Sequence, residues 1–198
     1  MSKLKEEKTL VIVKPDGVKR GLTGEIIRRI EQRGLKIIAL KMVWPTREQM
    51  DAHYPKSIDW ITNLGRNTER SYEEYKIKTT LKEDYGTEDL FEIGKMVREW
   101  LIEFMISGPL VQMVVSGLHA IPMVRKIVGP TIPSLAEMGT IRGDFSVDSP
   151  ALANTQKRAV HNLVHASGNA EEAENEIKLW FSVEEIHGYK RAEEDIMF

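Results

Sequence analysis

His165 is the histidine of this chain whose neighbours best suit a chemical role, because the small residues Ala166, Ser167 and Gly168 follow it and leave its ring accessible. An imidazole has a reference pKa of about 6.5, so at pH 7 one ring nitrogen carries a lone pair that can attack an electrophile without a further base. Glu176 lies in the predicted helix that follows, where a chain reversal can bring its carboxylate to the other ring nitrogen and fix the tautomer. The alternative is a half-buried histidine of a strand with no chemical role.

Several polar and cationic residues could hold a phosphorylated substrate. Lys14 enters the turn sequence KPDG at the end of an apolar run, where its charge can meet a phosphate oxygen, although the same sequence also forms plain turns. The chain contains neither a Walker A loop nor a GxGxxG fingerprint. Two guanidinium groups and a hydroxyl around the loop of residues 129–139 suit a polyphosphate, with solvated surface arginines as the alternative: Arg125, Arg142 and Thr131.

Four apolar runs alternate with helical patterns and are expected to build the sheet that positions these side chains. The predicted strands cover residues 11–13, 35–43, 110–116 and 159–165. The predicted helices begin near Thr23, at a capping box of Thr46 with Gln49, near Pro122 and near Glu171, and the charged stretch of residues 66–99 predicts one or two solvated helices. This alternation predicts helices on one or both faces of a sheet, and periodicity leaves open whether its strands are parallel or antiparallel.

The composition limits the class of protein. With 198 residues, of which 41% are hydrophobic and 29% charged, the chain suits one domain over residues 1–198 with a helical insertion at about 55–98. The net charge of -2 provides no basic field, so no nucleic acid and no membrane is expected as a partner. Cysteine is absent, which agrees with a reducing cytosol, and the N-terminus lacks the apolar core of a secretion signal. We therefore expect a cytoplasmic protein.

Six sequence blocks, taken in their order along the chain, resemble those of nucleoside diphosphate kinases. They are KPDGVKRGLTGEIIRRIEQRG, HY, SGP, VRKIVGPT, GTIRGDF and NLVHAS, and a glutamate follows in the next predicted helix. The resemblance covers most of the chain from Lys8 to about Phe181 and leaves two apparent expansions, at about residues 55–98 and 147–158. A single KPDG would be weak evidence, whereas ordered blocks around a histidine selected on chemical grounds are specific.

The resemblance implies a phosphotransferase with a ping-pong mechanism. His165 would take the γ-phosphate of a nucleoside triphosphate as phosphohistidine and pass it to a nucleoside diphosphate, with Mg²⁺ arriving on the nucleotide phosphates and no protein ligand for the metal. The supporting residues would be Lys14, Tyr54, Arg125, Thr131 and Arg142 at the phosphates, Asn162 at the sugar hydroxyl, and Ser167 with Glu176 behind the histidine.

The same resemblance implies an α+β fold of the ferredoxin-like split βαβ type, with a four-stranded antiparallel sheet, helices and the helical insertion. It also implies a symmetric homo-oligomer, a hexamer or a tetramer. The alternative function is a nucleotide-binding or scaffolding protein that keeps this fold without turnover.

Three features depart from the family pattern or complicate it. Gly168 stands where the common family signature has an aspartate, so the role of that aspartate is missing or taken over by another residue. The first expansion lies where the family contributes its base-stacking aromatic, near Val97 or Trp100. Asn162 and His165 are three residues apart and would face opposite ways in a flat strand, so a bulge or the strand end must re-aim one of them.

Overall fold

A four-stranded antiparallel sheet forms the centre of the computed structural model, which describes residues 6–192 and 194–197. The strands are β1 (Glu6–Val13), β2 (Lys36–Val43), β3 (Leu110–Leu118) and β4 (Val164–Ala166), in the spatial order β2-β3-β1-β4. Every pairing is antiparallel, with Val11 opposite Met113 between β1 and β3 and Ile12 opposite His165 between β1 and β4. Periodicity left open whether the strands are parallel or antiparallel, and the structure shows that they are antiparallel, which confirms the predicted fold.

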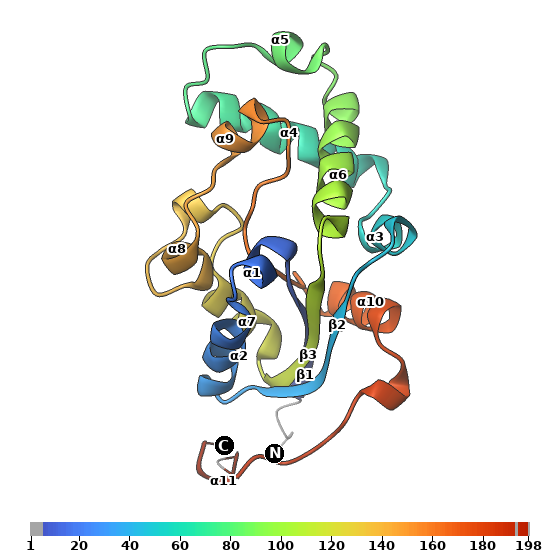
Figure 1. Cartoon of the computed structure of the whole chain (residues 1–198), viewed down its shortest axis with the longest axis vertical. Helices are drawn as coiled ribbons and strands as arrows, with labels where there is room; N and C mark the ends of the chain where they lie inside the picture. The colour runs from blue at the N-terminus through green and yellow to red at the C-terminus, as the bar shows by residue number, and fades with distance from the viewer. Residues whose placement is uncertain (1–5, 193, 198) are drawn as a thin grey trace.

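Side chains alternate between the two faces of β1, and each face carries its own apolar core. Val11 and Val13 belong to the core beneath α2 (Thr23–Gln32) and α7 (Ala120–Val128). Leu10 and Ile12 belong to the core on the other face, which α3 (Arg47–His53), α6 (Leu90–Ile106) and α10 (Ala170–Trp180) cover. Figure 1 shows α2 and α7 on one side of the sheet and α3 and α10 on the other.

The helices α4 (Ile58–Glu74), α5 (Leu81–Tyr85) and α9 (Pro150–Thr155) lie with the start of α6 beyond the sheet, at the top of Figure 1. The helices α4 and α6 cross with almost no space between their backbones. A Cβ on Gly65 would lie 1.9 Å from the carbonyl oxygen of Leu90, and a Cβ on Gly94 would lie 1.9 Å from the carbonyl oxygen of Ile61. The Asn154 amide of α9 donates to the Ser71 hydroxyl of α4 at 3.0 Å. The two expansions therefore pack against each other.

The predicted fourth strand is wrong in its extent, because only Val164–Ala166 pairs with β1, whereas residues 159–163 run as irregular chain. Leu163 has a left-handed backbone with φ of 68°, which an extended strand cannot contain, and Val164 N–H bonds back to Asn162 O at 2.7 Å. The apolar pattern of residues 159–165, from which the strand was predicted, gives no sign of this turn.

Short helices complete the chain. The turn KPDG opens a helix, α1 (Pro15–Lys19), which the sequence did not predict, with Pro15 at its first position. The others are α8 (Ile141–Phe145), α11 (Glu194–Met197), and two 3₁₀ turns, η1 (Pro133–Leu135) and η2 (Val183–Glu185). The capping box of Thr46 with Gln49 at α3 is present as predicted. In the described part of the chain, every helix is too short or too polar to cross a membrane.

Candidate active site

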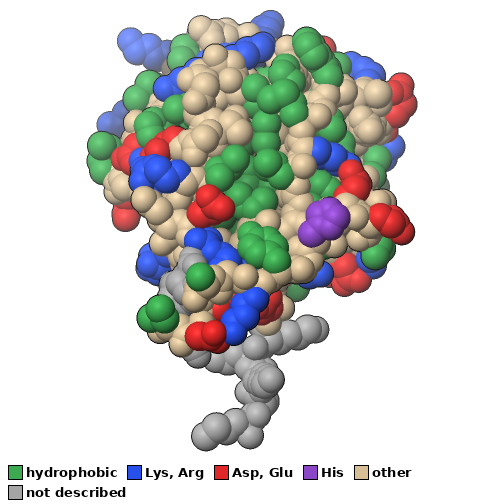
Figure 2. Space-filling view, turned by 60° about the horizontal axis from the view of Figure 1, so that its bottom comes forward, with side chains coloured by type: hydrophobic (Ala, Val, Ile, Leu, Met, Phe, Trp, Pro, Cys, Tyr) green, Lys and Arg blue, Asp and Glu red, His purple; other side chains and the backbone are tan. Residues whose placement is uncertain are grey.

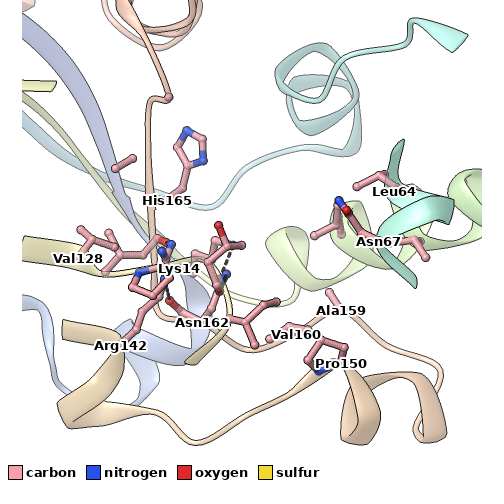
Figure 3. A pocket seen from close by; sticks show the side chains of 18 of the residues that line it. Lys14, Leu64, Asn67, Val128, Arg142, Pro150, Ala159, Val160, Asn162 and His165 are labelled. Atoms are coloured by element: carbon pink, nitrogen blue, oxygen red, sulfur yellow. Dashed lines mark hydrogen bonds between the residues drawn. The ribbon is translucent and has the colours of Figure 1, made fainter. Parts of the chain in front are cut away.

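A single cleft of about 1540 Å³ collects nearly all of the predicted site residues. Its walls come from the end of β1, the loop after α7, the chain that enters β4, and the helices α4, α6 and α10. In Figure 3, His165 stands at one end above Lys14, Arg142 and Asn162, and the cleft extends toward Leu64 and Asn67 of α4. Ser167 is the one predicted residue outside the lining, because it is fully buried behind it.

His165 points one ring nitrogen into the protein and leaves the other toward the cleft. Its Nε2 is buried and lies 2.8 Å from Oε1 of Glu176, with the carboxylate oxygen off the line of the N–H bond. Within the described residues, Nδ1 has no hydrogen-bond partner. The contact with Glu176 favours the tautomer with the proton on Nε2, so the lone pair of the neutral ring lies on Nδ1.

Glu176 is held from behind by Ser167. The Ser167 hydroxyl donates to Oε2 of Glu176 at 2.7 Å and accepts the N–H of Leu10 at 3.2 Å, which ties α10 to β1. Burial alone would raise the pKa of Glu176, yet its pKa is lowered below the ordinary value because His165 and Ser167 both stabilise the carboxylate. Glu176 is therefore an anion that orients His165.

His53 is a member of the site that the sequence did not single out. Its ring packs edge-on against the His165 ring with centroids 4.9 Å apart, and its Nδ1 accepts the indole N–H of Trp180 at 3.2 Å. Burial is the main cause that lowers the pKa of His53 to about 3, and the proximity of the second imidazole, His165, adds to it, so the His53 ring is neutral at pH 7. The block HY, which places His53 next to Tyr54, was the one indication of this position in the sequence.

Lys14 and Asn162 form a polar chain across the floor of the cleft. The Lys14 ammonium donates to Oδ1 of Asn162 at 2.7 Å, and the Asn162 amide donates to the carbonyl of Thr131 at 2.9 Å. Burial, and then the nearby charge of Arg142, lowers the pKa of Lys14 to about 8. At neutral pH the cleft thus holds a desolvated ammonium group, which a phosphate oxygen would stabilise.

Arg142 is buried and braces the chain that carries the histidine. Its guanidinium donates to the carbonyls of Asn162 at 3.0 Å, Gly129 at 2.7 Å and Val164 at 2.5 Å. Burial, and then the charge of Arg125, lowers its pKa to about 10, which leaves it charged at pH 7. A guanidinium has five N–H donors, so two remain for a ligand after these three bonds.

The strand end re-aims Asn162 and His165, as the spacing required. The left-handed Leu163 lies between them, and its N–H bonds to Oδ2 of Asp16 at 3.0 Å. Asp16 therefore fixes this turn from the KPDG segment, a role that the sequence did not reveal. Both Asn162 and His165 line the cleft as a result.

The remaining predicted residues lie around this centre. Tyr54 lines the cleft with its ring 5.1 Å from that of His53, and burial raises the pKa of its hydroxyl. Arg125 and Thr131 line the cleft from more exposed positions. The end remote from His165 has Leu64 and Asn67 on one side and Ala159 and Val160 on the other (Figure 3), and its lining includes both Val97 and Trp100.

A family model described as nucleoside diphosphate kinase matches residues 7–60 and 69–186 of the chain. The chain belongs to the nucleoside diphosphate kinase family. The enzymes of this family are phosphotransferases that move the γ-phosphate of a nucleoside triphosphate to a nucleoside diphosphate by a ping-pong mechanism. Membership confirms the predicted class of enzyme, and residues 61–68 of α4 are the internal segment that the family model does not match.

Individual relatives agree with this assignment. The nucleoside diphosphate kinase of Pyrobaculum aerophilum is 50% identical over 180 residues, which are 91% of this chain and 97% of the relative. A crystal structure of an NDP kinase from that organism superposes with a TM-score of 0.89 at 47% identity, over 93% of this chain and all of the other. A structure of the Borrelia burgdorferi nucleoside diphosphate kinase superposes with a TM-score of 0.77 at 36% identity, over 97% of this chain and 96% of the other. That structure is a transition-state mimic with bound vanadate and ADP.

Proposed function

We propose that His165 carries the phosphoryl group in the nucleoside diphosphate kinase reaction. The Nδ1 lone pair attacks the γ-phosphorus in line, the bond from that phosphorus to the β,γ-bridging oxygen breaks, and the nucleoside diphosphate leaves with the bond's electron pair. The second half-reaction reverses these steps with another diphosphate. The observation that carries the proposal is the orientation of His165, whose buried Nε2 lies beside the anionic Glu176, which leaves Nδ1 as the ring nitrogen on the side of the cleft.

The cationic and polar residues of the cleft would position the triphosphate. Phosphoryl transfer depends on alignment and on neutralisation of the phosphate oxygens, which the charges of Lys14, Arg125 and Arg142 supply. Thr131 and Tyr54 would add hydroxyl donors, and Asn162 would contact the sugar hydroxyl. The far end of the cleft offers the apolar side chains of Leu64, Ala159 and Val160 beside the polar Asn67, so we expect the base to be held mainly by packing against these apolar groups and to be discriminated weakly.

Mg²⁺ would enter as part of the nucleotide substrate. The described residues include one cluster with metal-ligand character, which consists of His53, His165 and Glu176. Two imidazoles and one buried carboxylate do not fit Mg²⁺, which prefers oxygen ligands and retains water. We therefore assign Mg²⁺ to the nucleotide phosphates and keep His165 free for the reaction.

We also propose that the chain forms a homo-oligomer, a hexamer or a tetramer, in the cytoplasm. The strand β2 is an outer strand of the sheet, with β3 as its partner, and Leu40, Met42 and Trp44 near its end are 53%, 62% and 68% exposed. Apolar side chains also gather in a patch on the face shown in Figure 2. Exposed apolar surface of this kind suits contact between copies. Light scattering would measure the mass, and a monomer at micromolar concentration would contradict this proposal.

A labelling experiment tests the proposed reaction. The protein is mixed with γ-labelled ATP and Mg²⁺, freed of nucleotide, and examined for label that is acid-labile and base-stable. We expect the wild type to keep such label and to lose it on addition of GDP, and His165→Ala to take none. If the wild type binds ATP but takes no label, the alternative of a nucleotide-binding scaffold without turnover is correct.

A further inference from the structure

Trp180 is a buried residue of α10 that lies one helical turn beyond Glu176. Residues four apart in an α-helix share a face, so the two side chains point to the same side of α10. There Glu176 contacts His165, and the Trp180 indole N–H donates to Nδ1 of His53 at 3.2 Å. One face of α10 therefore contacts both histidines of the site.

The hydrogen bond from Trp180 fixes the position of the proton on the His53 ring. An indole N–H can only donate, so Nδ1 of His53 must accept, and the proton of the neutral ring lies on Nε2. With a proton on Nδ1, two N–H groups would face each other in a buried place, and both would lose a partner. The bond therefore disfavours every form of His53 that is protonated on Nδ1, whether neutral or charged.

The position of this proton matters because both histidines lie beside the same carboxylate oxygen. Oε1 of Glu176 lies 2.8 Å from Nε2 of His165 and 3.7 Å from Nδ1 of His53, while Oε2 accepts the Ser167 hydroxyl. The contact between Oε1 and His165 is off the line of the N–H bond, so it is weaker than a linear hydrogen bond. A second donor at Nδ1 of His53 would compete for Oε1 and draw the carboxylate away from His165.

We propose that Trp180 is a positioning residue whose indole N–H keeps Nδ1 of His53 unprotonated and thereby reserves Oε1 of Glu176 for His165. The proposal rests on the proposed function, in which His165 keeps its proton on Nε2 and presents Nδ1 to the nucleotide. Trp180 lies outside the lining of the cleft, so it does not touch the nucleotide. Loss of its N–H should therefore slow the phosphorylation of His165 and leave the affinity for ADP unchanged.

Three variants of the full-length protein test the proposal by rapid-quench labelling with ATP. Trp180→Phe removes the N–H but keeps an aromatic ring, and it should slow phosphorylation about threefold to tenfold, the size expected for one hydrogen bond, at an unchanged Kd for ADP. The double change Trp180→Phe with His53→Phe also removes the competing nitrogen and should be phosphorylated faster than Trp180→Phe. The matched control is Trp44→Phe, which removes an indole N–H bond to the Ile106 carbonyl outside the cleft lining and should not change the rate.

Nitrogen-15 NMR of the histidine-labelled protein measures the His53 tautomer and separates this proposal from the proposed function. At pH 7 we expect a protonated Nε2 and an unprotonated Nδ1 in the wild type, and a population with a protonated Nδ1 in Trp180→Phe. A wild-type His53 protonated on Nδ1, or a Trp180→Phe variant with an unchanged tautomer or an unchanged rate, would overturn the proposal. A double variant as slow as Trp180→Phe would also overturn it, because lost packing would then explain the slower reaction. If the wild type takes no label, the proposed function is wrong whatever the tautomer of His53.

Discussion

The lowered pKa of Lys14 predicts a pH dependence of nucleotide binding that has a definite sign. Lys14 titrates near pH 8 in the free protein because it is buried and lies close to Arg142. Only the protonated amine attracts a phosphate, so bound phosphate must raise this pKa toward or above the ordinary value of about 10.4. The affinity for ADP should therefore be constant below about pH 7.5 and fall as the pH rises through 8.

The size of the effect follows from the two protonation states. Between pH 7 and pH 9 the protonated fraction of a group with a pKa near 8 falls about tenfold, so the Kd for ADP should rise about tenfold, or about 1.4 kcal/mol. Binding at pH 9 should take up about 0.9 proton from the buffer. Isothermal titration calorimetry of ADP with the unphosphorylated protein, repeated in buffers of different ionisation enthalpy, measures both quantities.

Two variants identify the group responsible. Lys14→Met should bind ADP weakly with little pH dependence over this range, whereas Lys19→Met should keep the wild-type dependence, because Lys19 contacts the carbonyl of Ser107 away from the cleft lining. A flat affinity from pH 7 to pH 9 in the wild type, or binding without proton uptake at pH 9, would show that Lys14 does not meet the phosphates.

Two further predictions concern the frame around the site. Gly65→Ala places a methyl group against the backbone of α6 and should lower the free energy of unfolding by about 1–3 kcal/mol in denaturant titration. The control Gly24→Ala, on the open side of α2, should raise the free energy of unfolding by up to about 1 kcal/mol. Equal effects of the two changes would contradict the close crossing of α4 and α6. Ser167→Ala removes the hydroxyl that holds Glu176 and should slow phosphorylation of His165 about tenfold or more in rapid-quench labelling. An unchanged rate would show that Glu176 orients His165 without the Ser167 hydroxyl.

The sequence predicted the site better than the path of the chain through it. Residue chemistry singled out His165, Lys14 and Glu176 as candidates while plain structural roles remained open, and the ordered blocks that resemble the family then favoured the chemical roles. The spacing of Asn162 and His165 also predicted that either a bulge or the strand end must re-aim one of these two side chains. In the structure the left-handed backbone of Leu163, whose N–H is bound by Asp16, makes this turn.

What the sequence could not provide depends on contacts between distant segments. The ring of His53, in α3, packs against the ring of His165, in β4, and no local pattern in the sequence specifies that approach of two distant segments. The packing of α4 on α6 requires two glycines, 29 residues apart in the chain, that each meet the backbone of the other helix, as Gly65 and Gly94 do. The hydrogen bond from the Gly168 N–H to the Glu172 carboxylate likewise depends on a side chain that folds back over a helix terminus, a conformation that propensity does not predict.

In the proposed reaction, Nδ1 of His165 bears the phosphoryl group while Nε2 stays with Glu176. Phosphorus NMR of the phosphorylated protein, combined with peptide mapping under base-stable conditions, identifies both the residue and the ring nitrogen. We predict a single phosphohistidine at His165 with phosphorus bonded to Nδ1. Phosphate on Nε2, or on another residue of the chain, would contradict the proposal that the orientation of His165 presents Nδ1 to the nucleotide.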